Sequence, residues 1–233
     1  MFGHLRHSTR FMEVLAAIVL SLGLWWMGSL SPSLTAVHVV PRPIVVLDPG
    51  HGGRDPGAIS RTGVMEKHIN LAIAQAVARI LRGSGVVVYL TRTQDQGPSS
   101  FHQSSVFNDL MARSRLARQF RATLFVTIHS NWEPSHTAHG PIVYYDAASP
   151  SSALLAAQVA KAFVPLLGYD RPTRPIRQLV LQQVTMPAIN VEVGFLSHSQ
   201  DSRLLVTPQY QETLASSIAK GILAYLRSRG LSY

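Results

Sequence analysis

Residues 44–53 read IVVLDPGHGG, a short apolar run that passes directly into a glycine-rich turn. The β-branched run Ile44–Leu47 predicts a buried strand, because it is short, apolar and bounded by proline and glycine. His51 follows this strand between glycines, which let a backbone turn sharply and approach a ligand closely. A purely structural turn would have the same sequence, so this stretch alone leaves both interpretations open.

Strands and helices alternate along the rest of the chain. Helices are expected at Glu66–Arg82, at Phe107–Phe120, from a Ser151 cap to about Leu167, and at Tyr210–Arg229. Further strands are expected at Val86–Thr91, Leu124–Ile128, Ile142–Tyr145, Leu179–Gln182 and Ala188–Val193. This order predicts a single α/β domain, a twisted and mainly parallel sheet with helices on both faces, preceded by an N-terminal apolar helix.

The composition fits one domain with a short appendage. The chain has 233 residues, of which 46% are apolar and 14% are charged, so it can bury a core. It has no cysteine, which excludes a disulfide scaffold, a cysteine nucleophile and a thiolate metal site. Any metal must therefore be held by histidines and carboxylates.

The N-terminal segment has the layout of an export signal or a signal anchor. Arg6 and Arg10 precede an uncharged stretch, residues 14–30, which is borderline in length for spanning a ~30 Å hydrocarbon core. The tripeptide at residues 34–36 is a poor cleavage site, which favours an uncleaved anchor over a cleaved signal. The expected parts are a signal peptide or membrane anchor at 1–36, a linker at 37–43 and the folded domain at 44–230.

The net charge of the chain is strongly positive, with a formal value of +9. Removing residues 1–36 removes two arginines and one glutamate, which leaves 21 − 2 = 19 basic and 12 − 1 = 11 acidic residues, or +8. Such a charge suggests a polyanionic partner, and nucleic acid is the first to consider. The N-terminal segment predicts instead that the body is exported to the cell envelope, anchored to the outer face of the cytoplasmic membrane or secreted. The sequence also lacks a DNA- or RNA-binding motif, so we expect no nucleic-acid partner.

Several polar residues lie where open α/β sheets collect their sites, at the carboxyl ends of strands. His51 and His129 each follow a strand core, and Glu66 opens a helix, where the helix dipole favours a carboxylate in any case. Two histidines and one glutamate would suit a catalytic zinc, which takes three such ligands and keeps one open position. Glu192 interrupts an apolar strand, where a buried ion is costly unless a metal or a catalytic role compensates it. Each of these four residues could also have a purely structural role.

The run LDPGHGGRDPGA at residues 47–58, followed by Glu66, resembles the opening signature of one enzyme family. This family is the zinc-dependent N-acetylmuramoyl-L-alanine amidases of the amidase 3 type. The resemblance continues in the family's order through Thr91-Arg92, Asp95, Arg113, LFVTIHSN at 124–131, Gly140, Tyr144-Tyr145 and PAINVEVGFLS at 187–197. It covers about residues 43–227, nearly the whole expected zinc amidase catalytic domain.

The resemblance implies that His51, Glu66 and His129 bind Zn²⁺ and that Glu192 is the catalytic carboxylate beside a zinc-bound water. Family members cleave the amide between N-acetylmuramic acid and the L-alanine of the stem peptide, so peptidoglycan is the expected substrate. Zinc can lower the pKa of bound water toward ~7, and Glu192 can move the released proton to the leaving amine. The small, anchored layout resembles amidases of endospore formers that act during spore-cortex maturation.

Four further residues are expected to contact substrate: Asn131, Arg92, Arg113 and His139. For Arg92 and Arg113 the alternative is a structural salt bridge, and for His139 a loop position at the rim of the cleft. The chain departs from the family at Arg118 and His198, where asparagine is usual. Neither departure touches an expected ligand.

The segments around His129 are too short for a helix that would plug the zinc site, so we expect a constitutively open site. Three other functions remain as alternatives. They are an inactive peptidoglycan-binding module, an exported zinc peptidase that cuts within the stem peptide, and a nucleic-acid-binding protein. The presence of all four expected site residues favours the enzyme.

Overall fold

The computed structural model describes residues 12–22, 42–97 and 105–233. Residues 12–22 form a helix with exposed side chains, which confirms the expected N-terminal apolar helix. The rest of the expected signal or anchor, and most of the expected linker, lie outside the described residues. Among the helices that are described, none is long and apolar enough to cross a membrane.

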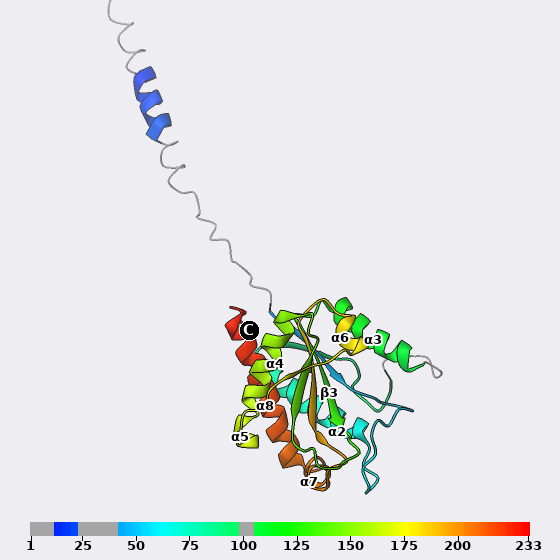
Figure 1. The fold of residues 1–233 in the computed structure, drawn as a ribbon. Helices are drawn as coiled ribbons and strands as arrows, with labels where there is room; N and C mark the ends of the chain where they lie inside the picture. Colours follow the sequence, from blue (N-terminus) through cyan, green and yellow to red (C-terminus); the bar gives the residue numbers. More distant parts are fainter. Residues whose placement is uncertain (1–11, 23–41, 98–104) are drawn as a thin grey trace, which may run out of the picture. The chain divides into compact units, whose positions relative to one another are not determined.

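A six-stranded sheet forms the centre of the body, in the order β2-β1-β3-β6-β4-β5 (Figure 1). The strands are β1 (Ile44–Pro49), β2 (Val87–Leu90), β3 (Leu124–Asn131), β4 (Ile142–Tyr145), β5 (Arg174–Pro175) and β6 (Ala188–Phe195). β4 runs antiparallel to β6, and the other neighbouring pairs are parallel. The expectation of a mainly parallel α/β sheet is therefore confirmed.

Helices cover both faces of this sheet, as expected. One face is covered by α2 (Glu66–Gly83), α4 (Pro150–Ala162) and α8 (Pro208–Ser228), and the other by α3 (Val106–Gln119) and α6 (Leu179–Gln182). The short helices α5 (Val164–Leu167) and α7 (Ser199–Leu204) complete the body.

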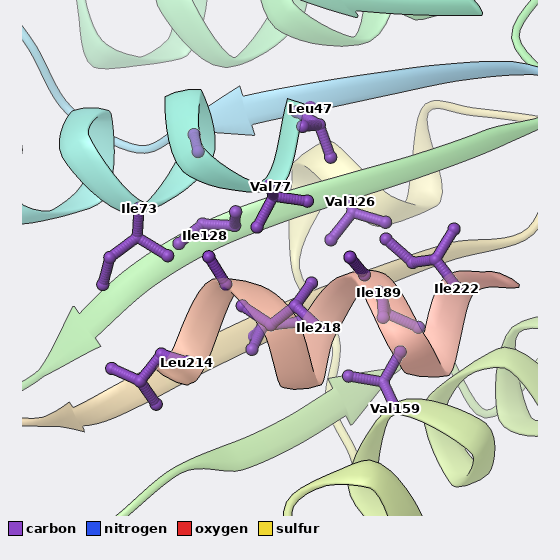
Figure 2. Close-up of a cluster of buried hydrophobic side chains, with 14 of the residues drawn as sticks. Leu47, Ile73, Val77, Val126, Ile128, Val159, Ile189, Leu214, Ile218 and Ile222 are labelled. Carbon is purple, nitrogen blue, oxygen red and sulfur yellow. The ribbon is translucent and has the colours of Figure 1, made fainter. Parts of the chain in front are cut away.

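Successive side chains of a strand point to opposite faces of the sheet, so the same strands contribute residues to both hydrophobic cores. Leu47 and Val126 are buried in the larger core with α2, α4 and α8, whereas Val46 and Phe125 are buried in the smaller core with α3 and α6. Figure 2 shows the larger core, in which α8 directs Leu214, Ile218 and Ile222 toward the sheet. The sheet is thus fixed from both sides, and its strand ends are held in place.

One predicted strand is wrong, because Leu179–Gln182 form the helix α6. Periodicity cannot separate a four-residue buried strand from a buried helical turn. Two helix boundaries also differ from expectation. The cap of α4 is Ser149, whose side chain accepts a hydrogen bond from the Ser152 backbone N–H, and the helix expected to reach Leu167 is divided into α4 and α5 at Phe163.

Candidate active site

Three adjacent parallel strands, β1, β3 and β6, bring their carboxyl ends to one edge of the sheet. His51 follows β1, His129 lies near the end of β3, and Glu66 is the first residue of α2. Each of these three side chains offers one ligand atom, and the three atoms lie within 4.8 Å of one another. The structure therefore brings together the three residues expected to bind a metal, and this group could hold one.

His51 is held in position from both ring nitrogens. Its backbone φ is 62°, in the left-handed region. Its Nδ1 lies 2.7 Å from Asp55 Oδ2, and its Nε2 lies 3.1 Å from Glu66 Oε2. Burial alone would lower the pKa of His51, but the two carboxylates raise it to about 9. A carboxylate on the second ring nitrogen is the usual support of a metal-binding histidine, and Asp55 occupies that place.

Glu66 is buried and accepts hydrogen bonds on both carboxylate oxygens. Oε2 accepts from the Ala58 backbone N–H at 2.8 Å, and Oε1 accepts from Asn70 Nδ2 at 3.0 Å and from the Ser130 backbone N–H at 3.1 Å. His129 Nδ1 lies 2.9 Å from Oε1. Burial would raise the pKa of Glu66, but the two histidines hold it well below its usual range. The carboxylate is therefore ionised and oriented, as a metal ligand must be.

Two glycines make room for the three side chains. A Cβ at Gly50 would lie 2.2 Å from His129 Cε1, and a Cβ at Gly57 would lie 2.5 Å from Glu66 Oε2. Both distances are shorter than real Cβ contacts allow. The glycines that follow β1 are therefore required by the close approach of the backbone to the site.

Glu192 lies on β6 and is the register partner of His129 on β3. Its side chain is buried, and Oε1 accepts a hydrogen bond from Asn190 Nδ2 at 3.0 Å. Oε2 is buried and has no hydrogen-bond partner among the described residues. Burial raises the pKa of Glu192. A buried carboxylate with one unpaired oxygen and a raised pKa is suited to accept a proton and give it back.

Arg92 and Arg113 are buried, and both donate hydrogen bonds to backbone carbonyls at residues 49–51. Arg113 donates from Nη1 to Asp48 Oδ1 at 2.6 Å and from Nη2 to the His51 carbonyl at 2.8 Å, so the alternative of a structural salt bridge applies to it. Arg92 donates to backbone carbonyls, including that of Gly50 at 3.0 Å, and makes no ion pair with any carboxylate that the structure describes. Contact of either arginine with substrate stays a prediction.

A cleft of about 510 Å³ lies at the ends of β3 and β6, where Asn131 and Phe195 line it together with Ile142, the register partner of Glu192. Its lining includes Asn131, Glu133, His139, Tyr144, Arg171 and Arg174. Asn131 and His139 thus lie where a substrate could reach them, although their contact with substrate stays a prediction. Residues 51–65 and 132–149, which flank the site in sequence, contain no helix that could plug it.

Three polar residues that support the site carry only weak sequence signals. Asp55 lies within the glycine-rich run, four residues after His51, and Asn70 lies one helical turn after Glu66. Asn190 precedes Glu192 by two residues, which in a strand places both side chains on one face. That spacing of two is the signal that could have predicted the hydrogen bond between Asn190 and Glu192.

Residues 45–224 match the amidase 3 family, whose description is N-acetylmuramoyl-L-alanine amidase. The chain belongs to this family. The match confirms the resemblance seen in the sequence and identifies the protein as an amide hydrolase of peptidoglycan.

Individual relatives of this amidase agree with the family match. The germination-specific N-acetylmuramoyl-L-alanine amidase of Bacillus subtilis (strain 168) is 33% identical over 196 residues, which cover 80% of this chain and 81% of the relative. The structure of the CwlD amidase from Clostridioides difficile, solved in complex with the GerS lipoprotein, has a TM-score of 0.74 and 29% identity and covers 80% of this chain and 100% of that one. An N-acetylmuramoyl-L-alanine amidase from Clostridium difficile 630 has a TM-score of 0.73 and 34% identity, covering 81% and 99%.

Proposed function

We propose that His51, Glu66 and His129 hold a Zn²⁺ ion and that Glu192 is the acid–base residue of this amidase. The bond cleaved is the amide between N-acetylmuramic acid and the L-alanine of the stem peptide. Two imidazoles and one carboxylate form a donor set that catalytic zinc uses, and the ligand atoms of the three residues already converge within 4.8 Å. The observation that carries the proposal is the unpaired, buried Oε2 of Glu192 beside His129.

The positions of the metal-binding group and of Glu192 assign a role to each in amide hydrolysis. When bound, zinc supplies a Lewis acid that activates water and polarises the scissile carbonyl. Glu192 takes a proton from the attacking water and delivers it to the leaving nitrogen of L-alanine. Its raised pKa suits both steps, because a base whose pKa is closer to the working pH returns its proton more readily. Asn190 holds Oε1 of Glu192, and Asp55 holds the ring of His51.

The proposed setting is the cell envelope, reached by export through the N-terminal segment. Residues 1–36 have the layout of a signal or a membrane anchor, and the body that follows carries a formal charge of +8 (19 basic minus 11 acidic residues). Stem-peptide carboxylates and other anionic wall polymers supply a matching negative charge. The germination-specific relative supports a role in the spore cortex.

Product analysis tests this function. The full chain, supplied with zinc, is incubated with purified peptidoglycan, and the soluble products are examined by mass spectrometry. We expect intact stem peptides that begin with a free L-alanine amino group. Fragments cut within the stem peptide would indicate the peptidase alternative instead. Binding to peptidoglycan without any release would indicate the inactive binding module.

A further inference from the structure

A row of polar side chains crosses five strands of the sheet next to the level of Glu192. Register partners join Asp48 to Thr127, Thr127 to Asn190, Asn190 to Tyr144, and Tyr144 to Arg174. Register partners direct their side chains to the same face of a sheet, and so do residues two apart in one strand. The row therefore shares its face with Glu192, which lies two residues beyond Asn190.

The two ends of this row differ in the hydrogen-bond partners of their side chains. At one end, the Asp48 carboxylate is buried and accepts hydrogen bonds from Thr127 at 2.8 Å and from Arg113 at 2.6 Å. At the other end, Tyr144 and Arg174 line the cleft, and so does Ile142, the register partner of Glu192. The first end is a closed structural network, whereas the second faces the space that a substrate would enter.

Arg174 is the arginine of the cleft whose guanidinium is least occupied. Arg171 donates to the backbone carbonyls of residues 139–141 and to the Tyr169 hydroxyl, which fixes it as a support of the cleft wall. Arg174 is exposed and is the register partner of Tyr144, and its charge acts on the Tyr144 hydroxyl. It forms no ion pair with a carboxylate in the part of the chain that the structure describes. A guanidinium has five N–H donors, so a bidentate carboxylate contact remains open to it.

The charges around the cleft favour an anion at this place. Glu133 is the acidic residue among the described lining, and both of its carboxylate oxygens accept hydrogen bonds from Ser135. Arg171 and Arg174 supply positive charge on the wall formed after β4. Tyr144 lies between Asn190 and Arg174 in the row, and the charges of Glu192 and Arg174 both act on its hydroxyl. Arg174 thus offers an anionic group of a substrate a positively charged contact on this wall of the cleft.

The spacing matches the stem peptide. Neighbouring strands are ~4.8 Å apart, so the backbone of Arg174 lies about 10 Å from that of β6, and its side chain lies on the same face as Tyr144 on β4. In an extended peptide each residue spans ~3.4 Å, which puts the residue after L-alanine about 7 Å from the scissile carbonyl. In peptidoglycan that residue is a glutamate linked through its side chain, and its α-carboxylate is free unless it is amidated.

We propose that Arg174, with Tyr144 beside it, binds this α-carboxylate and makes the enzyme prefer stem peptides in which the carboxylate is free. The inference rests on the proposed function, because the distance is counted from the scissile amide. It assigns Arg174 as a specificity-determining residue of the same site, one strand beyond the residues that flank Glu192.

A pair of muropeptides tests the inference. The two substrates are disaccharide tripeptides that differ only in carrying a carboxylate or a carboxamide at the α-position of the second residue. For the zinc-loaded full chain we expect kcat/KM to be about tenfold or more higher for the carboxylate, since charge-assisted hydrogen bonds are stronger than neutral ones. Arg174→Gln should remove this preference by lowering only the kcat/KM for the carboxylate. Arg177→Gln is the matched control, because Arg177 is an exposed arginine of the same segment that does not line the cleft.

The possible outcomes separate the inference from the proposed function. Equal kcat/KM values for the two substrates in the wild-type enzyme would overturn the role of Arg174 and leave the amidase chemistry intact. An Arg174→Gln variant that loses activity equally on both substrates would overturn it as well. Failure of the wild-type enzyme to cleave either muropeptide at the lactyl amide would contradict the proposed function together with the inference.

Discussion

His129 and Glu192 are register partners on the neighbouring parallel strands β3 and β6. This pairing places an imidazole that can bind a metal beside a buried carboxylate whose Oε2 has no partner among the described residues. The parallel arrangement makes the pairing possible, because residues 60 or more positions apart in sequence reach the same edge of the sheet. The same edge receives His51 from β1.

Replacing Glu66 by glutamine should weaken metal binding. The variant loses an ionised ligand on which both histidines converge. We expect the metal affinity to fall by more than the ~10–100-fold that follows loss of a supporting partner. Competition with a chromogenic chelator measures this affinity. Glu212→Gln is the control, because Glu212 is an exposed residue of α8 that forms an ion pair with Arg79. An unchanged metal affinity in Glu66→Gln would exclude Glu66 as a ligand.

Replacing Gly50 by alanine should displace His129 and so disturb the site. The added Cβ would lie 2.2 Å from the imidazole ring, and neither the ring nor the turn can yield without moving a ligand. We expect loss of metal affinity and of amidase activity, measured on the same preparation. Gly83→Ala adds the same methyl group where nothing lies within 4 Å, so it should leave both properties unchanged. A fully active Gly50→Ala enzyme would show that the ring does not sit over this glycine.

Replacing Asp48 by asparagine should destabilise the fold. Removing one partner of the buried Asp48–Arg113 pair leaves an uncompensated charge, which typically costs about 3–5 kcal/mol. The free energy of unfolding in urea measures the loss. Asp170→Asn, on an exposed loop, is the control and should unfold like the wild type. A wild-type value for Asp48→Asn would show that the ion pair does not stabilise the fold.

The pH dependence of this stability has a definite sign. Burial would raise the pKa of Asp48, but Arg113 and the neighbouring hydroxyls hold it below its usual value of 3.8. The folded state therefore favours the ionised form, and the stabilisation is present above pH 3.8 and lost as the pH falls through the lower folded pKa. We expect the difference in unfolding free energy between wild type and Asp48→Asn to shrink below about pH 3.8. A difference that grows in acid would contradict this sign.

The amino-acid sequence predicts those parts of the molecule that follow from the pattern of apolar and polar residues along the chain. His51, His129 and Glu192 could be found because each follows or interrupts an apolar strand and parallel strands share one edge, and Glu66 because it opens a helix. The helix α6 was not predictable in this way, since a run of four residues, three of them apolar, fits a buried strand as well as a buried helical turn. The partners of Arg92 were not predictable either, because backbone carbonyls leave no trace in the sequence. The two-residue strand β5 is too short for any periodicity, yet it carries Arg174 into the cleft.

Zinc content and peptidoglycan turnover, measured side by side for wild type and Glu192→Gln, test the central claim most directly. Glu192 is assigned to proton transfer and not to metal binding, so both proteins should bind one zinc ion per chain. Release of stem peptides should fall by at least about 100-fold in the variant, the lower range for loss of a general acid–base residue. Near-normal turnover by a zinc-loaded Glu192→Gln enzyme would contradict the assignment of Glu192.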